Sequence, residues 1–368
     1  MRSFKLRQVA FQFHRYVGLS VGLILVIVGL TGSLLVFEHE MDQRIIQYRF
    51  GQVIPQEQRL PLSKIAEIVT TAYRDRPEFK LAQFDIPPNT ETYKLRLRNS
   101  KNEDLEVFVN PYTGKILGDR SREGAFFSRV VELHYTLFAK EVGRVVVGIV
   151  AFLLCLLSVT GLLLWPGWRK LVTGFRIKWD AHPKRLNFDL HKVAGITSVM
   201  FLLMIAVSGF CWNFYEYAEP AIYALTLTPK PPELKSTVLA GNPRLSIDEI
   251  AQQADAALPG AITTFISIPT KPDGVFYFYK KQPQDAQNYA NVVQLDQYSG
   301  RVLRVVNSQT ATLGDRILNA FVPMHYGTFW GLPSRILYVF VGLAPLLLSI
   351  TGFVMWRYRK KHNEVMER

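Results

Sequence analysis

The sequence is poor in cysteine and lacks the signatures of several common catalytic sites. Cys155 and Cys211 are its only cysteines, which excludes a disulfide framework, a C-x-x-C redox site and a thiolate metal site. The C-x-x-C-H signature of covalently attached c-type haem is absent as well. No P-loop, dinucleotide-binding glycine motif, nucleophile elbow or H-E-x-x-H zinc motif occurs. No nucleotide- or flavin-binding domain is therefore evident in this chain.

Charge is also scarce over long stretches of the chain. Charged residues make up 20% of the sequence and hydrophobic residues 49%. Four runs of about 20 residues are almost free of charge, and each would cover roughly 30 Å as a helix, the thickness of a bilayer core. They predict an integral membrane protein with four transmembrane helices. The runs are Val17–Phe37, Val145–Trp165, Val193–Phe214 and Ile336–Trp356.

The first apolar run follows a basic start and could be mistaken for a secretory signal. It is longer than the apolar core of such a signal, and no A-x-A-like cleavage site follows it. We therefore expect it to be retained as a membrane span.

Acidic residues are outnumbered, and the formal net charge is +13. The basic residues gather at the N-terminus, in the connection Arg169–Arg185 and in the tail from Arg357. All three clusters flank apolar runs, so the positive-inside rule predicts that they lie in the cytoplasm, together with both termini. The long connections near 39–142 and 215–335 are then expected outside. The basic excess thus describes membrane topology and does not indicate a nucleic-acid partner.

An internal duplication is the strongest pattern that the sequence does contain. Aligning His14 with His191 places FHRYVG opposite LHKVAG, and Gly32 in LTGS then meets Gly209 in VSGF without a gap. Matches in an unbroken register indicate a repeated unit.

A second alignment extends the duplication to the other two apolar runs. Aligning His134 with His325 places LHYTLF opposite MHYGTF, and Arg144 then meets Arg335. In the same register SVTG at 158–161 meets SITG at 349–352, again without a gap.

The two external connections repeat as well. LPLSKIAEIV from Leu60 resembles LSIDEIAQQA from Leu245, and both have the spacing of an amphipathic helix. Strand-like runs follow, TYKLRLR with LEVFVN and GVFYFYK with NVVQLD. Each set closes in a turn where Gly114 or Gly300 allows a tight bend. Each half therefore reads as span, small α+β domain, span, which predicts two parallel repeats related by an axis along the membrane normal.

These motifs carry a family resemblance over essentially the whole chain. The helix–strand segment that ends in YTGKIL resembles a PepSY domain. Four spans around two such segments, with FHRYVG, LHYTLF and LHKVAG at the membrane edges, resemble the PepSY-associated transmembrane family. Within it the chain is similar to ferric-siderophore reductases of the bacterial inner membrane, including the ferrioxamine type. This resemblance implies a membrane α+β fold, periplasmic PepSY-like domains and a reductase activity on iron.

The resemblance and the repeats together predict a division of the chain into seven segments. They are the cytoplasmic N-terminus with the first span (1–41), a PepSY-like domain (42–123), a His-bearing interfacial segment with the second span (124–168), a cytoplasmic loop (169–186), the third span (187–216), a second PepSY-like domain (217–310), and a His-bearing interfacial segment with the fourth span and tail (311–368).

Four repeated histidines are the candidate cofactor ligands. His14 and His191 are expected at the cytoplasmic edge, and His134 and His325 near the external edge. A pseudo-twofold axis brings equivalent residues of two repeats together, as an iron macrocycle with one axial imidazole on each side requires. We therefore expect two b-type haems, which need no covalent attachment. A polar residue tolerated at the membrane interface is the alternative for any one histidine.

Residues near the histidines have weaker assignments. Gly32 and Gly209 follow His14 and His191 by 18 residues, or five helical turns, so a shared inward face or ordinary helix packing explains them. Four basic residues recur beside the histidines and are candidate partners of haem propionates, although interfacial anchoring explains them as well. They are Arg15, Lys192, Arg144 and Arg335.

His39 is a separate candidate. It lies between Glu38 and Glu40 and has no histidine counterpart in the second half, where Glu216 takes its place. It is a possible alternative ligand or contact for iron in transit, and a solvated surface residue is the competing interpretation. His182 and His362 receive no role.

The leading hypothesis is a di-haem membrane oxidoreductase. Electrons would come from a separate cytoplasmic donor or from quinol and would reduce a ferric siderophore outside. Reduction loosens the metal because hard oxygen ligands hold Fe(III) better than Fe(II). Tyr277, Phe278 and Tyr279 are either strand core or a shelf for the acceptor. The alternative is a non-catalytic scaffold whose PepSY-like domains bind a periplasmic partner, and a transporter is disfavoured because mid-membrane ionisable groups are lacking.

Overall fold

The structure is a computed structural model that describes residues 2–87, 92–238, 243–285 and 291–366, with the backbone alone at 2–4 and 361–366. The chain forms two compact units. The helical unit comprises Met1–Glu38, Val130–Ala221 and Ala320–Arg368, and the sheet unit comprises His39–Arg129 and Ile222–Asn319.

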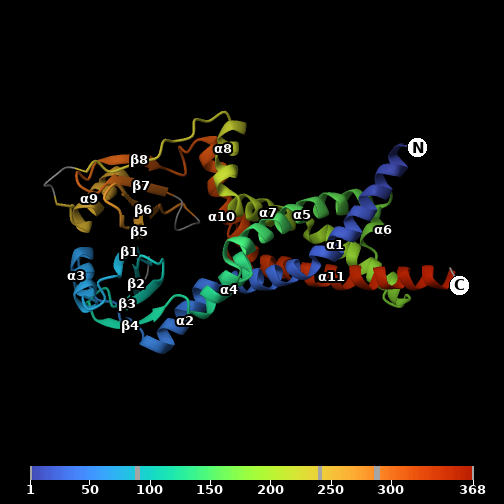
Figure 1. Cartoon of the computed structure of the whole chain (residues 1–368), viewed down its shortest axis with the longest axis horizontal. Coiled ribbons are helices and arrows are strands. Elements are labelled where there is room, and N and C mark those ends of the chain that lie inside the picture. The colour runs from blue at the N-terminus through green and yellow to red at the C-terminus, as the bar shows by residue number, and fades with distance from the viewer. Residues whose placement is uncertain (1, 88–91, 239–242, 286–290, 367–368) are drawn as a thin grey trace. The chain divides into compact units, whose positions relative to one another are not determined.

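Four long helices build the helical unit (Figure 1). They are α1 (Arg2–Leu35), α5 (Lys140–Leu164), α7 (Pro183–Asn213) and α11 (Leu332–Met366). Each contains a segment long and apolar enough to cross a bilayer, with mean hydropathy between 2.1 and 2.7. The prediction of four membrane spans is therefore confirmed, although α1 and α7 begin well before the apolar runs.

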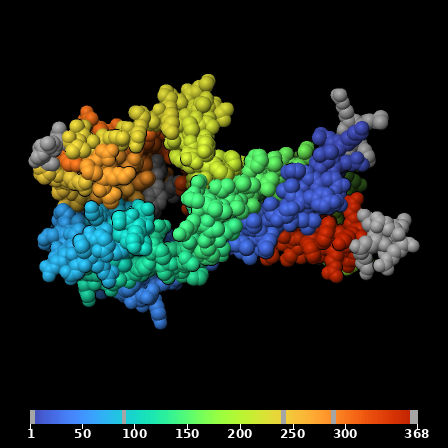
Figure 2. Space-filling view, in the orientation of Figure 1, coloured from blue at the N-terminus to red at the C-terminus, as the bar shows by residue number. Residues whose placement is uncertain are grey.

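The four helices pack in a closed ring. Helix α1 contacts α5 and α11, and α7 contacts the same two helices; Figure 2 shows α1 between α5 and α11 on one face. Close approach requires glycine at one crossing, since a Cβ on Gly29 of α1 would collide with the carbonyl oxygen of Gly342 on α11. There Ser33 donates a hydrogen bond of 2.9 Å to the carbonyl of Val339. Small residues thus allow backbone contact between helices from opposite ends of the sequence.

Short helices carry the chain into and out of the long ones. They are α2 (Glu38–Phe50), α4 (Phe126–Thr136), the 3₁₀ turn η1 (Pro166–Trp168), α6 (Leu171–Phe175), α8 (Tyr215–Leu225) and α10 (Leu313–Tyr326). Helix α4 is separated from α5 because Leu137 and Phe138 have φ angles of 50° and 60°, which a right-handed helix cannot include. Gly327 and Gly331, at φ 68° and 65°, separate α10 from α11 in the same way.

The sheet unit contains one antiparallel sheet of eight strands in the order β4-β3-β2-β1-β5-β6-β7-β8. The strands are β1 (Lys80–Asp85), β2 (Tyr93–Arg98), β3 (Asp104–Val109), β4 (Ile116–Ser121), β5 (Ile262–Ser267), β6 (Val275–Lys281), β7 (Asn291–Asp296) and β8 (Val302–Val306). The strands expected from TYKLRLR, LEVFVN, GVFYFYK and NVVQLD are confirmed as β2, β3, β6 and β7. The pairing of β1 with β5, with Phe84 opposite Ile266, joins both segments into one sheet and was not predicted.

Helices α3 (Leu62–Ala72) and α9 (Ile247–Ala257) cover one face of this sheet, as Figure 1 shows. Both were predicted from their amphipathic spacing. Ile65 and Ile250 pack into a single core with strand residues such as Phe84 and Phe278, all of them fully buried. Asp248 of α9 accepts hydrogen bonds from the backbone N–H groups of Leu62 and Ser63 at 2.9 and 3.2 Å, so one helix caps the other.

The two predicted turns close the outer hairpins. Gly114 and Gly300 have φ angles of 72° and 67°, in the left-handed region where glycine has no steric penalty. The side chains of Asn110 and Asp296 accept hydrogen bonds from the backbone of the turn that each begins. The prediction of a tight bend at each glycine is confirmed.

Candidate functional site

The structure brings together the two histidines that were predicted to pair at one end of the helical unit. His14 lies on α1 and His191 on α7, both within long helices rather than in front of them. Their ring centroids are 6.2 Å apart and their planes are inclined at 82°.

The second predicted pair has the same geometry at the other end. His134 and His325 lie in the last turns of the short helices α4 and α10. Their ring centroids are 6.1 Å apart and their planes are inclined at 81°. One arrangement therefore occurs twice in the helical unit.

Each of the four imidazoles is hydrogen-bonded through Nδ1 to a side-chain hydroxyl on a neighbouring helix. The hydroxyl belongs to a threonine or serine deep in an apolar segment, where few other polar partners exist. The bonds are His14–Thr160 at 3.0 Å, His134–Thr31 at 3.0 Å, His191–Thr351 at 2.9 Å and His325–Ser208 at 2.9 Å.

A glycine follows each of these hydroxyl residues and leaves room for the ring. A Cβ built on Gly32 would lie 3.1 Å from Cε1 of His134, and one on Gly161 would lie 3.3 Å from Cε1 of His14. The corresponding distances for Gly209 to His325 and Gly352 to His191 are 3.4 and 3.6 Å. Larger side chains at these positions would occupy the space of the imidazoles.

Gly32 and Gly209, expected on the inward faces of His14 and His191, each meet the histidine of the other pair: Gly32 packs against His134 and Gly209 against His325. The reason is distance along the helix, since 18 residues correspond to about 27 Å and reach the opposite end of the bundle. The hydroxyl before each glycine was overlooked in the sequence, although LTG, VSG, SVTG and SITG all contain it.

A cavity of about 2000 Å³ surrounds the first pair and includes both His14 and His191 in its walls. Its volume exceeds the roughly 300–1,000 Å³ of a typical small-molecule pocket. Most of its lining is apolar, and basic side chains of Arg7, Arg15 and Lys192 reach it. The space would accept a large, mostly apolar group with anionic substituents.

Two of the four predicted propionate partners lie in this wall. Arg15 donates hydrogen bonds of 2.6 Å to both Gln12 and the hydroxyl of Tyr16. Lys192 is buried and pairs with the buried carboxylate of Asp189 at 2.5 Å. Both already have partners within the chain, and their role toward a propionate stays a prediction.

The other two basic candidates hold the ends of helices. Arg335 on α11 donates to the backbone carbonyl of Val36 at 2.6 Å, just beyond the end of α1. Arg144 on α5 donates to the carbonyl of Asn213, the last residue of α7. Each guanidinium thus satisfies a carbonyl at a helix C-terminus, a position that favours positive charge.

His39 is exposed and begins the sheet unit, in the first turn of α2. Helix α1 ends at Leu35, so His39 is not on a continuation of that helix. In the part of the chain that the structure describes, no three histidine, cysteine, aspartate or glutamate residues gather as a metal site. The proposed iron contact of His39 stays a prediction.

The three aromatic residues considered as a surface for the electron acceptor do not all face the same side of the sheet. Phe278 is fully buried in the core beneath α3 and α9. Tyr277 and Tyr279 alternate with it on β6 and are half-buried on the opposite face. Only the two tyrosines are therefore available on that face.

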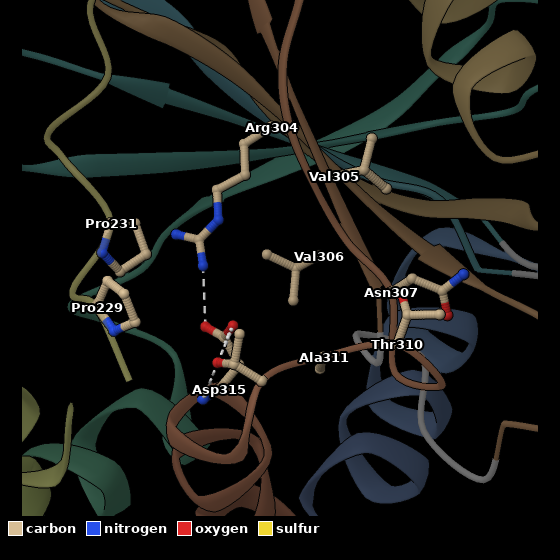
Figure 3. A pocket seen from close by; sticks show the side chains of 10 residues that line it. Pro229, Pro231, Arg304, Val305, Val306, Asn307, Thr310, Ala311 and Asp315 are labelled. Carbon is tan, nitrogen blue, oxygen red and sulfur yellow. Dashed lines mark hydrogen bonds and ion pairs between the residues drawn. The ribbon is translucent and has the colours of Figure 1, made fainter. Parts of the chain in front are cut away.

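A small pocket lies at the beginning of α10 in the sheet unit. Its volume is about 280 Å³, and Figure 3 shows Arg304 and Asp315 facing each other across it with Pro229 and Pro231 nearby. Arg304 donates to Asp315 at 2.9 Å, as does the hydroxyl of Tyr223 at 2.7 Å. The charges of this pocket are already paired, and we assign it no ligand.

Comparison with known proteins identifies the same family as the motifs. The profile of the PepSY-associated TM region matches residues 11–359. An uncharacterized protein of Pseudomonas aeruginosa is similar to this chain, with 24% identity over 255 residues. That match covers 63% of this chain and 63% of the relative, slightly less than two thirds of its length.

Proposed function

Because the chain belongs to the PepSY-associated transmembrane family, we propose that it is a membrane oxidoreductase that binds two b-type haems, one at each histidine pair. The observation that carries this proposal is the repeated geometry of the pairs, with ring centroids 6.2 and 6.1 Å apart. The membrane spans support the bilayer as its location.

The distances fit a metal ion between two imidazoles. A bond of about 2.0 Å from the metal to each ring nitrogen places the two ring centroids about 6 Å apart. Each pair supplies two imidazoles, the number that would hold the iron of a b-type haem. A closed tetrahedral metal site would need more ligands, and no such cluster occurs among the described residues.

The two pairs lie at different depths of the helical unit. Thr31, which binds His134, follows His14 by 17 residues on α1, so the pairs are separated by about 25 Å along that helix. Haems bound at these levels would supply one-electron carriers on either side of an apolar layer. The side chains of the four long helices would hold them apart and exclude water between them.

The orientation follows from charge. We propose that the end with His14 and His191 faces the cytoplasm, because the basic segments near Arg7, Arg169 and Arg359 lie on that side of the spans. The sheet unit then lies in the periplasm, and the membrane is the bacterial inner membrane. No donor domain is evident in the sequence, so the electron comes from a separate cytoplasmic reductase or from quinol.

We further propose that the chain consists of two parallel repeats, each with one PepSY-like domain. The order of elements supports this, because α1-α2-α3-four strands-α4-α5 is followed, after η1 and α6, by α7-α8-α9-four strands-α10-α11. The contacts repeat as well. Arg144 donates to the backbone carbonyl of Asn213, and Arg335, at the equivalent position, donates to the backbone carbonyl of Val36. The sheet order is symmetric about the junction of β1 with β5.

The proposed acceptor is a ferric siderophore. One electron converts its Fe(III) to Fe(II), which oxygen chelators hold less tightly, so the metal is released. The family resemblance supports this acceptor, and the half-buried Tyr277 and Tyr279 offer an aromatic surface on the sheet.

Haem content tests the proposal directly. We expect the detergent-solubilised chain to show reduced-minus-oxidised spectra of b-type haem, with about two haems per chain in a pyridine haemochrome assay. His14→Ala and His325→Ala should each lower this to about one. His182→Ala is the histidine control: His182 lines the cavity of the first pair but belongs to neither pair, since its ring accepts from Lys184 N at 3.3 Å and packs against Tyr358, so both haems should be kept. A colourless protein from haem-replete cells would reject the oxidoreductase and favour a PepSY scaffold that binds a periplasmic partner.

A further inference from the structure

We propose that the four hydroxyl residues bound to the imidazoles are positioning residues that determine which nitrogen of each histidine binds iron and how each ring is turned. We call them the hydroxyl anchors: Thr31, Thr160, Ser208 and Thr351. This inference rests on the proposed function, because it concerns how the haems are held.

Each anchor already donates its hydroxyl proton to a backbone carbonyl of its own helix. Each hydroxyl lies within hydrogen-bond distance of the backbone carbonyl four residues earlier, as is common for serine and threonine in apolar helices. A hydroxyl has one proton to donate and can also accept. Its oxygen is therefore the acceptor toward Nδ1. The distances are 2.8 Å for Thr31, 2.8 Å for Thr160, 2.8 Å for Ser208 and 2.7 Å for Thr351.

The neutral imidazole that results carries its proton on Nδ1. A neutral ring has only one N–H group, so Nε2 keeps its lone pair and is the nitrogen available to iron. Hydrogen bonding at the opposite nitrogen also raises the basicity of the ligand. The anchors thus prepare all four histidines for the same mode of ligation.

The anchors also fix the ring planes. Rotation about the outer side-chain bond of histidine is broad and restricted only weakly by the backbone. Here each ring is attached at Cβ to one helix and through Nδ1 to another, so its plane is held at two points. The two planes of each pair are crossed at 82° and 81°. Crossed axial imidazoles make low-spin ferric haem strongly anisotropic, with a larger maximum g value than parallel ones.

Thr351 offers a clean test because its hydroxyl can be removed with little change in shape. In Thr351→Val we expect the ring of His191 to turn, so that one of two low-spin ferric EPR signals moves to a smaller maximum g value. The midpoint potential of the same haem should rise, because a less basic ligand stabilises the ferric state less. Thr351→Ser keeps the hydroxyl and should restore both properties.

Thr197 supplies the matched control. It also lies in a membrane span, but its hydroxyl bonds only to the carbonyls of Val193 and Ala194 and to no histidine. Thr197→Val should change neither EPR signal. Ser208→Ala should move the other EPR signal and leave the first unchanged, because Ser208 contacts the second pair.

The outcomes separate this inference from the proposed function. Two haems with unchanged EPR signals and potentials in Thr351→Val and Ser208→Ala would overturn the role of the anchors and leave the haem protein intact. Loss of haem at one pair in Thr351→Val, with recovery in Thr351→Ser, would support it. Equal loss of haem in both Thr351 variants would overturn it, and a wild-type chain without haem would overturn both proposals.

Discussion

The two histidine pairs have the same ring geometry on different backbones. His14 and His191 are interior residues of α1 and α7, with helical turns on both sides. His134 and His325 are near the C-terminal ends of α4 and α10, which are interrupted before the next span. The same hydroxyl and glycine contacts occur at all four rings. The ring geometry therefore comes from these contacts and does not depend on helix continuity.

The surroundings of the two pairs differ in polarity. Beside His191 lies the buried ion pair of Lys192 with Asp189. Beside His325 lies the ring of Trp212, whose centroid is 4.8 Å away. The first pair is thus next to fixed charges and the second next to an aromatic side chain, so equal ligands are placed in unequal electrostatic environments.

The largest expected effect comes from filling the space beside one ring. Gly161→Val should displace His14 and remove the haem of the first pair, whereas Gly32→Val should displace His134 and remove that of the second. Haem content should fall from about two to about one per chain in each case. Gly124→Val is the control, since Gly124 is exposed in the sheet unit and the nearest atom to a Cβ there is 3.6 Å away. If either variant lost both haems, the two pairs would not be independent.

The next effect should appear only near the first pair. Lys192→Met removes the closest cation from the buried carboxylate of Asp189, which keeps a partner in Arg185 at 3.1 Å. Removing one partner of a buried ion pair costs about 3–5 kcal/mol when the charge is left unpaired. With Arg185 in place we expect a loss of about 1.5–3 kcal/mol, that of a hydrogen bond to a charged group. Arg15→Met, at the equivalent position of the first half, should cost less than about 1 kcal/mol, because Arg15 is bonded to neutral partners. Thermal unfolding in detergent compares the variants, and equal melting temperatures would contradict the difference.

A smaller effect should be confined to the second pair. Gly327 has a φ angle of 68°, and a Cβ there would collide with the ring of Tyr338. Gly327→Ala should cost about 1–3 kcal/mol and disturb the haem of His325. Gly331 has a similar φ angle of 65°, but no atom lies within 4 Å of a Cβ added there, so Gly331→Ala is the matched comparison. It should therefore be milder in both haem content and melting temperature, and the reverse order would contradict the role of this turn.

The smallest expected effect is a change in stability at acid pH, contributed by Asp315 in the first turn of α10. Burial alone would raise the pKa of Asp315, but hydrogen bonds from Thr312 and Tyr223 and the charge of Arg304 hold it below its ordinary value of 3.8. A lowered pKa in the folded state means that the carboxylate stabilises the fold above pH 3.8 and loses this contribution as the pH falls through the folded pKa. Asp315→Asn should remove that part of the acid sensitivity, which is of the order of 1 kcal/mol. Identical acid unfolding curves for both proteins would reject this assignment.

Much of the fold follows from local patterns in the sequence. Hydropathy located the four spans, amphipathic spacing located α3 and α9, and alternation located β2, β3, β6 and β7. The turns at Gly114 and Gly300 followed from residue type. The pairing of β1 with β5 could not be read in this way, because a strand pattern states which face is buried and not which partner it meets.

The histidine pairs themselves were determined by the sequence, because an unbroken register between two repeats shows which residues occupy equivalent positions. Only the tertiary structure decided which hydroxyl binds which ring. Those contacts join residues 103, 117, 146 and 160 positions apart, and they depend on the crossing of helices rather than on spacing within one. Periodicity places a side chain on a face of its own helix, but the packing of neighbouring helices determines what that face meets.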